Sequence, residues 1–414
     1  MPSKPNLLFV GDYNREDYLN LFTACKQHFS FYFLEYTSAK EESSTLYKEY
    51  GQAIYWSNFN SAFELLDIIK PHKVIFTFIE SYFHTALNLT CKVKGVTTYH
   101  IDHGIRDINI NVRFETLLIN YIKQGAKTSK FITIIKQLLP RLKARIFLLN
   151  TYRKLPFPEA QYMMSFSKVR RKNIYLETKK LVPSPFALPT AYISFSPSIF
   201  KVHQFYDTPP PNYKVHHIGI PNFDHLAGVL PHTPHQKYVL FIDQGLHIRN
   251  MFGWSLNTYK NFITQLSQEL SESGYTIYAK PHPTQFNLNK DALPVAENIS
   301  IIDDIELKRL LPSTRIVLGF FSTYLLPIAA LPHTTLITLE NHPAGKLLVS
   351  KSFVDAGVAH PVYDMQELDW ALQHVEQLHQ EQLPNKKQFE QDWLYKFDGK
   401  AGERLRDILL REEL

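Results

Sequence analysis

The tetrapeptide Lys280-Pro281-His282-Pro283 is the segment of the sequence with the most specific chemistry. It follows the apolar run 276–279, which has the pattern of a buried strand. Because each proline restricts its own backbone φ, the lysine and the histidine are held in one direction. A cation beside an imidazole suits a diphosphate or a phosphate leaving group, whose negative charge grows as its bond breaks. The alternative is a turn with a solvated lysine and a hydrogen-bonded histidine.

Two adjacent hydroxyls, Ser322 and Thr323, come directly before a helical pattern over 324–330. Such a pair predicts, first of all, a helix N-cap. The free N–H groups at the start of a helix also attract anions, so the same residues can hold a phosphate. Gly319, just upstream, would allow a ligand to approach the backbone closely.

An aspartate and a histidine stand together in the first half of the chain, in Asp102-His103-Gly104 after the strand-like run 96–99. A carboxylate or an imidazole at a strand end can remove a proton from an acceptor hydroxyl, and the glycine leaves room for that acceptor. Either Asp102 or His103 can be the base. The alternative is an ordinary turn, since the chain has 18 histidines.

The common sequence patterns for cofactors and metals do not occur. There is no Gly-x-Gly-x-x-Gly after a strand, no Walker loop and no His-Glu-x-x-His. The acidic pair Asp303-Asp304 lies among isoleucines and is interpreted as a loop or helix cap rather than a metal site. We therefore predict no metal and no cofactor, with the leaving phosphate neutralised by side chains.

Short apolar runs alternate with helical patterns in both halves of the chain, which predicts an α/β fold with parallel sheets. The predicted strands are 7–10, 31–34, 53–56, 74–78, 96–99, 215–218, 238–242, 276–279, 316–318 and 335–339, with helices at 61–69 and 86–93. Ligands bind outside the carboxyl ends of parallel strands, so the polar residues there should converge. The residues predicted to bind a donor in the second half are Gln244, Gly245, Lys280, Gly319, Ser322, Thr323 and Glu340.

The length and composition are those of a folded protein with two domains. The chain has 414 residues, of which 44% are hydrophobic and 20% charged, and domains of about 200 residues are ordinary. The run Thr-Pro-Pro-Pro at 208–211 predicts a boundary there. We expect an N-terminal domain over 1–210 and a C-terminal domain over 211–414.

The cysteines and the apolar runs favour a cytoplasmic protein. Cys25 and Cys91 are the only cysteines, too few for a disulfide framework, which favours a reducing compartment. The first residues run directly into a strand pattern instead of a leader peptide, and no apolar run reaches the ~18 residues of a spanning helix.

A basic stretch over 121–180 stands apart from the rest of the chain. It holds ten Lys, five Arg and two Glu, a net charge of +13, whereas the whole chain carries +6 and the remainder therefore −7. Large apolar residues alternate with the cations in a helical pattern over 131–149 that is broken at Pro140. A helix of this kind is typical of a membrane interface, where cations meet anionic headgroups. The alternative is a solvated helical insertion.

In this order, Asp102-His103-Gly104, His282-Pro283 and Ser322-Thr323 resemble the motifs of a group of bacterial transferases. The group includes sialyltransferases and polysialyltransferases, capsule Kdo transferases and CDP-glycerol glycerophosphotransferases. Residues 219–224, Gly-Ile-Pro-Asn-Phe-Asp, are similar to a Gly-x-Pro-x-x-Asp segment of many members. The sequence departs from the sialyltransferase pattern at His103, where a second acidic residue is usual, and from the glycerophosphotransferase pattern at Asp102.

The resemblance implies a GT-B fold, in which two Rossmann-like domains face a central cleft. It implies that His282 binds or protonates the donor phosphate, that Lys280 assists, and that Ser322 and Thr323 hold the phosphate. The implied activity is metal-independent transfer of a sugar from a nucleotide donor, cytidine-linked such as CMP-sialic acid or CMP-Kdo, in surface polysaccharide synthesis.

Other functions remain open at this point. A polyol-phosphate transferase or a nucleotide-sugar 2-epimerase would share the fold, and a non-catalytic membrane or nucleic-acid binding protein would use the basic stretch. We predict as partners a nucleotide-sugar donor, a glycan or lipid-linked acceptor and an anionic membrane surface, and we predict no nucleic acid because base-stacking and helix-turn-helix patterns do not occur.

Overall fold

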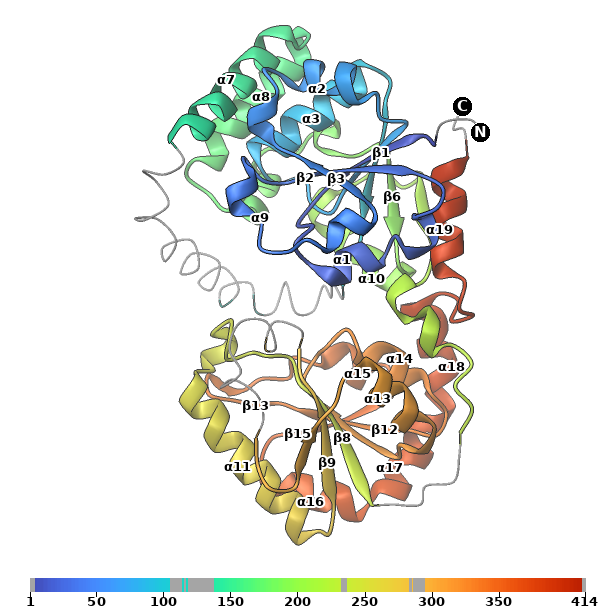
Figure 1. Ribbon diagram of the computed structural model, residues 1–414. Helices are drawn as coiled ribbons and strands as arrows, with labels where there is room; N and C mark the ends of the chain where they lie inside the picture. Colours follow the sequence, from blue (N-terminus) through green and yellow to red (C-terminus); the bar gives the residue numbers. More distant parts are fainter. Residues whose placement is uncertain are drawn as a thin grey trace. The chain divides into compact units, whose positions relative to one another are not determined.

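The computed structural model describes residues 4–104, Phe114, Leu117, residues 138–231 and 237–282, Gln285 and residues 295–411. The chain forms two compact units, each built on its own parallel sheet (Figure 1). Unit 1 comprises residues 1–104, 125–224 and 399–414, and unit 2 comprises residues 105–124 and 225–398.

The sheet of unit 1 has seven parallel strands in the order β3-β2-β1-β4-β5-β6-β7. Their bounds are β1 Asn6–Val10, β2 Ser30–Leu34, β3 Gly51–Ile54, β4 Lys73–Phe76, β5 Thr97–Ile101, β6 Ala191–Ser194 and β7 Val215–His217. The α-helices of this unit are α1 Glu16–Asn20, α2 Ala62–Ile69, α3 Tyr82–Val93, α7 Leu138–Lys154, α8 Phe157–Arg170, α9 Tyr175–Leu181, α10 Pro197–Asp207 and α19 Ala401–Leu410. The predicted strands 7–10, 31–34, 74–78, 96–99 and 215–218 overlap β1, β2, β4, β5 and β7, whereas the predicted strand 53–56 shares only residues 53 and 54 with β3, because Trp56 begins a 3-10 helix. Residues 7–10 and β4 are buried, as continuous apolar runs in a parallel sheet predict.

The sheet of unit 2 has six parallel strands in the order β10-β9-β8-β11-β12-β15. Their bounds are β8 Tyr238–Ile242, β9 Thr276–Lys280, β10 Ile299–Ile301, β11 Ile316–Gly319, β12 Thr335–Leu339 and β15 Ala359–Val362, with a small hairpin of β13 Asn341–His342 and β14 Gly345–Lys346. The α-helices are α11 Leu256–Glu272, α13 Asp304–Leu310, α14 Leu325–Ala330, α15 Lys351–Asp355, α16 Met365–Gln373, α17 Val375–Gln382 and α18 Lys386–Phe389.

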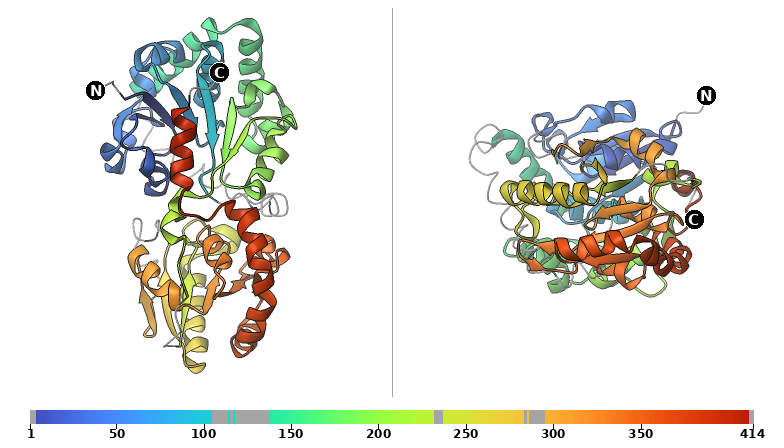
Figure 2. Two further views of the ribbon diagram at one scale, coloured as in Figure 1. Left: turned by 90° about the vertical axis from the view of Figure 1, so that its right-hand side faces the viewer. Right: turned by 90° about the horizontal axis from the view of Figure 1, so that it is seen from below.

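The division between the units differs from the predicted boundary at 210. β7 pairs with β6 and is the last strand of the first sheet, so unit 1 continues to Asp224. The C-terminal helix α19 also belongs to unit 1, and Figures 1 and 2 show it beside the N-terminal elements. The Asp224 carboxylate accepts the N–H groups of Ala401 and Gly402 at 2.9 and 2.8 Å, an N-terminal cap. Lys73 caps the other end by donating to the Ile408 carbonyl at 3.0 Å.

The described part of the basic stretch consists of packed helices. On α7, Phe147 is buried against Trp56, and Thr151 accepts the Ala62 N–H at 2.8 Å. The predicted break at Pro140 is wrong within the described residues, because α7 spans Leu138–Lys154 and includes the proline. The predicted start of this helix, 131–137, lies outside the described residues.

Candidate active site

The polar residues of unit 2 lie at the carboxyl ends of β8, β9 and β11. The strand order changes direction between β8 and β11, and ligands bind at such a switch point in open α/β sheets. Residues 243–245 follow β8, His282 follows β9, and residues 320–323 follow β11. The structure therefore brings most of the predicted donor-binding residues to one edge of the sheet.

Asp243 is a buried hydrogen-bond acceptor at the centre of this edge. One carboxylate oxygen accepts the Gly245 N–H at 3.0 Å, and the other accepts the Gln285 side-chain amide at 2.6 Å and the Tyr259 hydroxyl. Burial, together with the charge of Asp243, raises the pKa of Tyr259 well above its usual value, which keeps the hydroxyl as the donor. Asp243 thus fixes Gln285, a residue that the sequence patterns did not single out.

The turn at His282 is held by a contact to its backbone. The side-chain oxygen Oε1 of Gln285 accepts the His282 backbone N–H at 2.5 Å. Gly245 has a φ of +63°, and a β-carbon there would lie 3.4 Å from the β-carbon of His282, so the two turns pack closely. The Arg249 guanidinium nitrogen lies 3.4 Å from Nε2 of His282. Because a guanidinium can only donate, Nε2 of His282 is the acceptor in this contact, and Arg249 brings a positive charge to the turn of His282.

Lys280 is buried at the end of β9, and its ammonium group contacts two residues of neighbouring elements. Its Nζ lies 3.3 Å from the Asp304 carboxylate and 5.4 Å from the centre of the Tyr324 ring. Tyr324 in turn donates its hydroxyl to Asp304 at 2.6 Å. Of the acidic pair, Asp303 is the predicted helix cap, accepting the Glu306 N–H at 2.9 Å. Asp304 instead orients Lys280 next to the segment that carries Ser322 and Thr323.

Ser322 and Thr323 form a turn before α14 rather than its N-cap. Tyr324 is the N-cap residue, and its N–H lies 3.4 Å from the Ser322 hydroxyl. At Gly319 a β-carbon would lie 3.0 Å from the Leu325 side chain and 3.1 Å from the Ile242 carbonyl, so packing inside the unit also favours a glycine there.

Glu340 is not placed as the prediction of a donor-binding residue requires. It is fully buried and accepts the backbone N–H groups of Val349 and Ser350 at 2.6 and 3.3 Å. Burial raises the pKa of Glu340, although these hydrogen bonds partly oppose that effect. Its role is to hold the turn before α15. Nearby, burial lowers the pKa of His342 to about 4, and the ring accepts the Trp254 indole N–H at 3.0 Å.

Gln244 has a buried side-chain oxygen with no hydrogen-bond partner among the described residues. The residue follows β8 directly, at the switch point of the sheet. An unpaired buried acceptor costs free energy, which a ligand N–H or hydroxyl can recover. Gln244 is therefore the predicted donor-binding residue with the clearest open hydrogen-bonding position.

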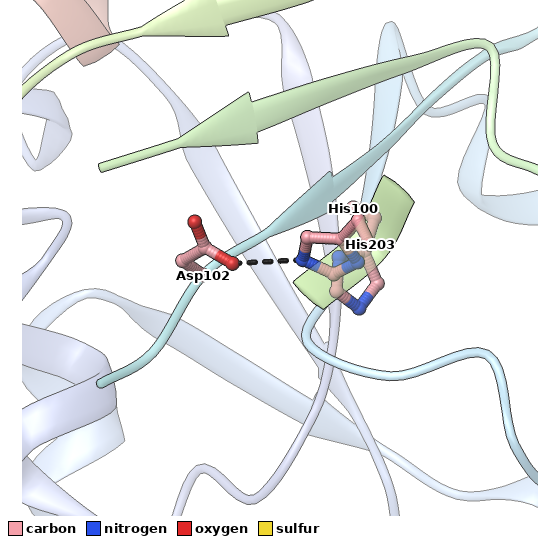
Figure 3. Close-up of side chains that lie close together, drawn as sticks. All are labelled: His100, Asp102 and His203. Carbon is pink, nitrogen blue, oxygen red and sulfur yellow. Dashed lines mark hydrogen bonds and ion pairs between the residues drawn. The ribbon is translucent and has the colours of Figure 1, made fainter. Parts of the chain in front are cut away.

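In unit 1, Asp102 is completely buried at the end of β5. One carboxylate oxygen accepts the Ser194 hydroxyl at 2.6 Å and the Phe195 N–H at 3.1 Å. The other lies 2.9 Å from Nε2 of His203 (Figure 3). This arrangement corrects the prediction of Asp102 as a reacting group, because every one of these contacts is internal to the unit.

His203 connects Asp102 to a second buried carboxylate. Its Nδ1 lies 3.0 Å from Asp207, four residues later on α10. Asp207 also accepts from the Lys179 ammonium at 2.5 Å and from the Tyr192 hydroxyl at 3.0 Å. Burial acts to raise the pKa of Asp207, but Lys179 and His203 outweigh it and hold that pKa well below its usual range. Asp207 is therefore ionised at neutral pH.

His103 differs from Asp102 in being partly exposed. Its ring makes edge contacts with Phe78 and Tyr18, with ring centres 4.3 and 5.1 Å away. Phe78 follows β4 and Tyr18 lies on α1, so two neighbouring segments orient the imidazole. Of the two candidate bases, His103 is the one that is partly exposed.

Within the described residues, His100, Asp102 and His203 form a group of possible metal ligands whose donor atoms lie within 4.8 Å of one another (Figure 3). All three side chains are buried. A tetrahedral zinc ion with bonds of about 2.0 Å would separate its ligand atoms by about 3.3 Å. The 2.9 Å between Asp102 and His203 is instead an ordinary hydrogen-bond distance.

No sequence pattern assigned the following residues to the site: Ser194, His203, Asp207, Asp243, Arg249, Asp304 and Gln285. Some local signals existed. Asp243 follows a predicted strand, and His203 and Asp207 have the i, i+4 spacing of one helix face. The contact of Asp102 with His203 spans 101 residues of sequence, and no local pattern indicates it.

The two parallel sheets of Rossmann type, each with polar residues at the carboxyl ends of its strands, are those of the GT-B fold. Solved structures of this class resemble the whole chain. The calicheamicin glycosyltransferase is 12% identical with a TM-score of 0.53, covering 99% of this chain and 98% of its own. The glycosyltransferase of kitacinnamycin is 10% identical with a TM-score of 0.51, covering 99% and 100%. One structure of the wall teichoic acid polymerase TagF is 12% identical with a TM-score of 0.50, covering 98% and 87%. At these identities the likeness establishes the fold.

Residues 6–341 match the family described as alpha-2,8-polysialyltransferase (POLYST), and the chain belongs to this family. No curated protein sequence matches it. The chain is thus a GT-B glycosyltransferase of surface polysaccharide synthesis that takes a nucleotide-activated sugar and a glycan acceptor. Of the functions left open by the sequence, transfer of a sugar is the one that the family supports.

Proposed function

We propose that the enzyme transfers an acidic sugar of the sialic acid or Kdo type from its CMP-linked form to a glycan or lipid-linked acceptor. The reaction would take place at the cytoplasmic face of the membrane. The observation that carries this proposal is the pairing of His282 with Arg249 at the switch point of unit 2. A guanidinium donor beside the imidazole that follows β9, at a ligand-binding edge, suits a phosphate.

In the proposed reaction the bond between the anomeric carbon and the donor phosphate oxygen breaks, and the phosphate leaves with the electron pair. His282 and Arg249 stabilise this growing negative charge, while Lys280 adds a positive charge beside the segment of Ser322 and Thr323. The acceptor oxygen forms the new bond to the anomeric carbon. His103 takes the proton that the acceptor hydroxyl loses.

No step of this scheme requires a metal ion or a cofactor. The leaving phosphate meets the guanidinium, the ammonium and the imidazole, which are the groups that replace a divalent cation in metal-independent transfer. Gln244 supplies an acceptor for a donor N–H or hydroxyl of the nucleotide. We propose that this residue contributes to recognition of the base or the ribose.

A nucleotide panel tests the donor class. CMP and CDP are each added to the protein in a thermal unfolding assay, beside UMP, UDP, GDP and ADP. We expect selective stabilisation by cytidine nucleotides, because a ligand present at 100 times its Kd adds roughly 2.7 kcal/mol to the stability of the folded state. In a domain of about 200 residues this corresponds to a shift in Tm of roughly 5–10 °C.

Two matched variants locate the bound nucleotide. Arg249→Met should lose most of the shift, whereas Arg309→Met should keep it, because Arg309 is an exposed arginine of the same unit that pairs with Glu306. Equal shifts from all nucleotides, or none from cytidine nucleotides, would contradict the proposed donor.

The described part of the basic stretch also supports attachment to an anionic membrane. Among the described residues, no helix is both long and apolar enough to cross a bilayer. On α7, however, Leu142, Ile146 and Leu149 are 51%, 43% and 48% exposed. Their i, i+4, i+7 spacing puts them on one face of the helix. Lys143 and Arg145 are exposed and flank this apolar stripe on its two sides.

Such a stripe suits the boundary between headgroups and acyl chains, and each nearby cation adds about 1 kcal/mol at an anionic surface. Phe157, at the start of α8, is 79% exposed and extends the apolar surface. The opposite face of α7 carries Phe147 and Thr151, which are committed to the core of unit 1. The helix can therefore bind a membrane without unfolding.

Neutralising Lys143 and Arg145 to glutamine, or changing Leu142 and Ile146 to serine, should release the protein from phosphatidylserine or phosphatidylglycerol vesicles. A sedimentation assay should show several-fold weaker binding for each pair, and high salt should weaken the wild type because it screens the exposed charges. Turnover of a short soluble acceptor should be unchanged.

The control carries Lys260→Gln and Lys308→Gln, two exposed lysines of unit 2. Vesicle binding that is indifferent to salt and to both α7 pairs would argue against this surface. Two further basic residues of the stretch, Lys136 and Arg141, have side chains outside the described residues and are left unchanged in these variants.

A further inference from the structure

We infer that His203 is a positioning residue that holds the Asp102 carboxylate in place and thereby keeps His103 in its reactive position. The inference rests on the proposed role of His103 as the base. It concerns a histidine that never reaches a substrate, since only 2% of its side chain is exposed.

The first observation is the way in which the carboxyl end of β5 is tied to the rest of unit 1. Asp102 binds the Ser194 hydroxyl at the end of β6, the Phe195 N–H directly after it, and His203 on α10. His103 is the next residue along the chain. Each of these three contacts therefore limits how far the backbone at His103 can shift.

The second observation is that His203 has no freedom of its own. Asp207 lies 3.0 Å from its Nδ1, and Asp207 is held by Lys179 and Tyr192. The result is a buried chain of hydrogen bonds from Lys179 through Asp207 and His203 to Asp102. In a buried network the loss of one member leaves its partners without hydrogen bonds, so the whole arrangement is rigid.

Proton transfer requires the catalytic base to be placed precisely relative to the acceptor hydroxyl. A displacement of about 1 Å of a catalytic group is enough to lower a rate by roughly 10²-fold. Without the His203 contact, Asp102 keeps its two bonds to residues 194 and 195 but loses the constraint from α10. His103 would then sample positions between Phe78 and Tyr18 in which it does not meet the acceptor hydroxyl.

A metal ion bound by His100, Asp102 and His203 is the competing explanation of the same cluster. Both oxygens of Asp102 and both ring nitrogens of His203 already face hydrogen-bonding partners within unit 1. These contacts satisfy the two side chains without an ion. The hydrogen-bonded arrangement is therefore the one that the geometry favours.

Two amide substitutions at His203 distinguish the contact made by Nε2 from the contact made by Nδ1. In His203→Gln the amide nitrogen reaches the place of Nε2 and can still donate to Asp102, whereas in His203→Asn it reaches only the place of Nδ1. We expect kcat to fall at least about tenfold in His203→Asn and to return to within about threefold of wild type in His203→Gln. Stabilisation by the donor nucleotide should be the same in both, because its site lies in unit 2.

The control is His379→Asn, the same change at a buried histidine of unit 2 that contacts the Thr334 carbonyl. It should reduce Tm without lowering kcat per folded molecule. If His203→Asn does not fold, Ser194→Ala removes another contact of Asp102 and should lower kcat in the same way.

Three results would overturn the inference. Wild-type kcat in folded His203→Asn would show that His103 does not depend on this contact. Equal loss in the asparagine and glutamine variants would show that the donor to Asp102 is not what matters. A stoichiometric metal in the purified enzyme, whose removal abolishes turnover, would assign the cluster to an ion. Should the wild type itself transfer no sugar, the proposed function fails instead.

Discussion

His282→Ala is expected to abolish sugar transfer while the protein remains folded. The imidazole, whose Nε2 lies 3.4 Å from the Arg249 guanidinium, is the side chain proposed to meet the leaving phosphate. Loss of one such group from a site of developing charge costs on the order of 10²–10³-fold in kcat. The fold should survive because the contact that anchors this turn uses the backbone N–H of His282 and the side chain of Gln285.

Release of CMP from a CMP-linked sugar, measured with and without acceptor, gives the rate, and the thermal transition reports the fold. His374→Ala is a suitable control, since His374 is a half-buried histidine of the same unit that stacks on Trp370. Near-wild-type turnover in His282→Ala would remove the central residue of the proposed mechanism.

His103→Ala is expected to lose turnover by roughly 10²-fold or more, with nucleotide binding unchanged. A general base contributes 10²–10⁴-fold to rates of this kind, and the proposed base lies in the unit that does not carry the nucleotide site. Asp102→Asn should behave differently. Because the buried carboxylate accepts three internal hydrogen bonds, its loss should lower the thermal stability and reduce kcat through displacement of His103.

Steady-state kinetics with a soluble acceptor, together with thermal unfolding of both variants, distinguishes the two residues. Activity in His103→Ala combined with inactivity in a folded Asp102→Asn would identify the carboxylate as the base. Full activity in both variants would show that the Asp102-His103-Gly104 segment is a turn without a catalytic role.

Much of the fold follows from local sequence. The apolar runs that became β1, β4, β8, β11 and β12 are buried along their whole length, as strands between two helical layers must be. β6 was not predicted, although Ala191–Ser194 is equally buried. Its four residues mix apolar and polar types, so their burial depends on the neighbouring strands β5 and β7 rather than on their own pattern.

The extent of each unit could not be predicted in the same way. The Thr-Pro-Pro-Pro run does separate two elements, α10 and β7. Because β7 pairs with β6, however, both elements belong to the same unit. The return of α19 to unit 1 depends on Asp224 and Lys73, which bind the two ends of that helix across 177 and 335 residues of sequence. Contacts over such separations leave no periodicity in the chain.

For the candidate site, sequence alone determined which residue types stand at the strand ends, because the strand pattern and the prolines around His282 are local. Tertiary structure decided which of them are free to act. Pairing of β5 with β6 and the approach of α10 bury Asp102, while His103, the next residue, remains partly exposed. The Glu340 carboxylate accepts the backbone N–H of Val349 inside the unit, and close packing against Leu325 favours a glycine at position 319. The physical reason is that burial and hydrogen-bond pairing depend on partners far away in the sequence, whereas residue type and spacing do not.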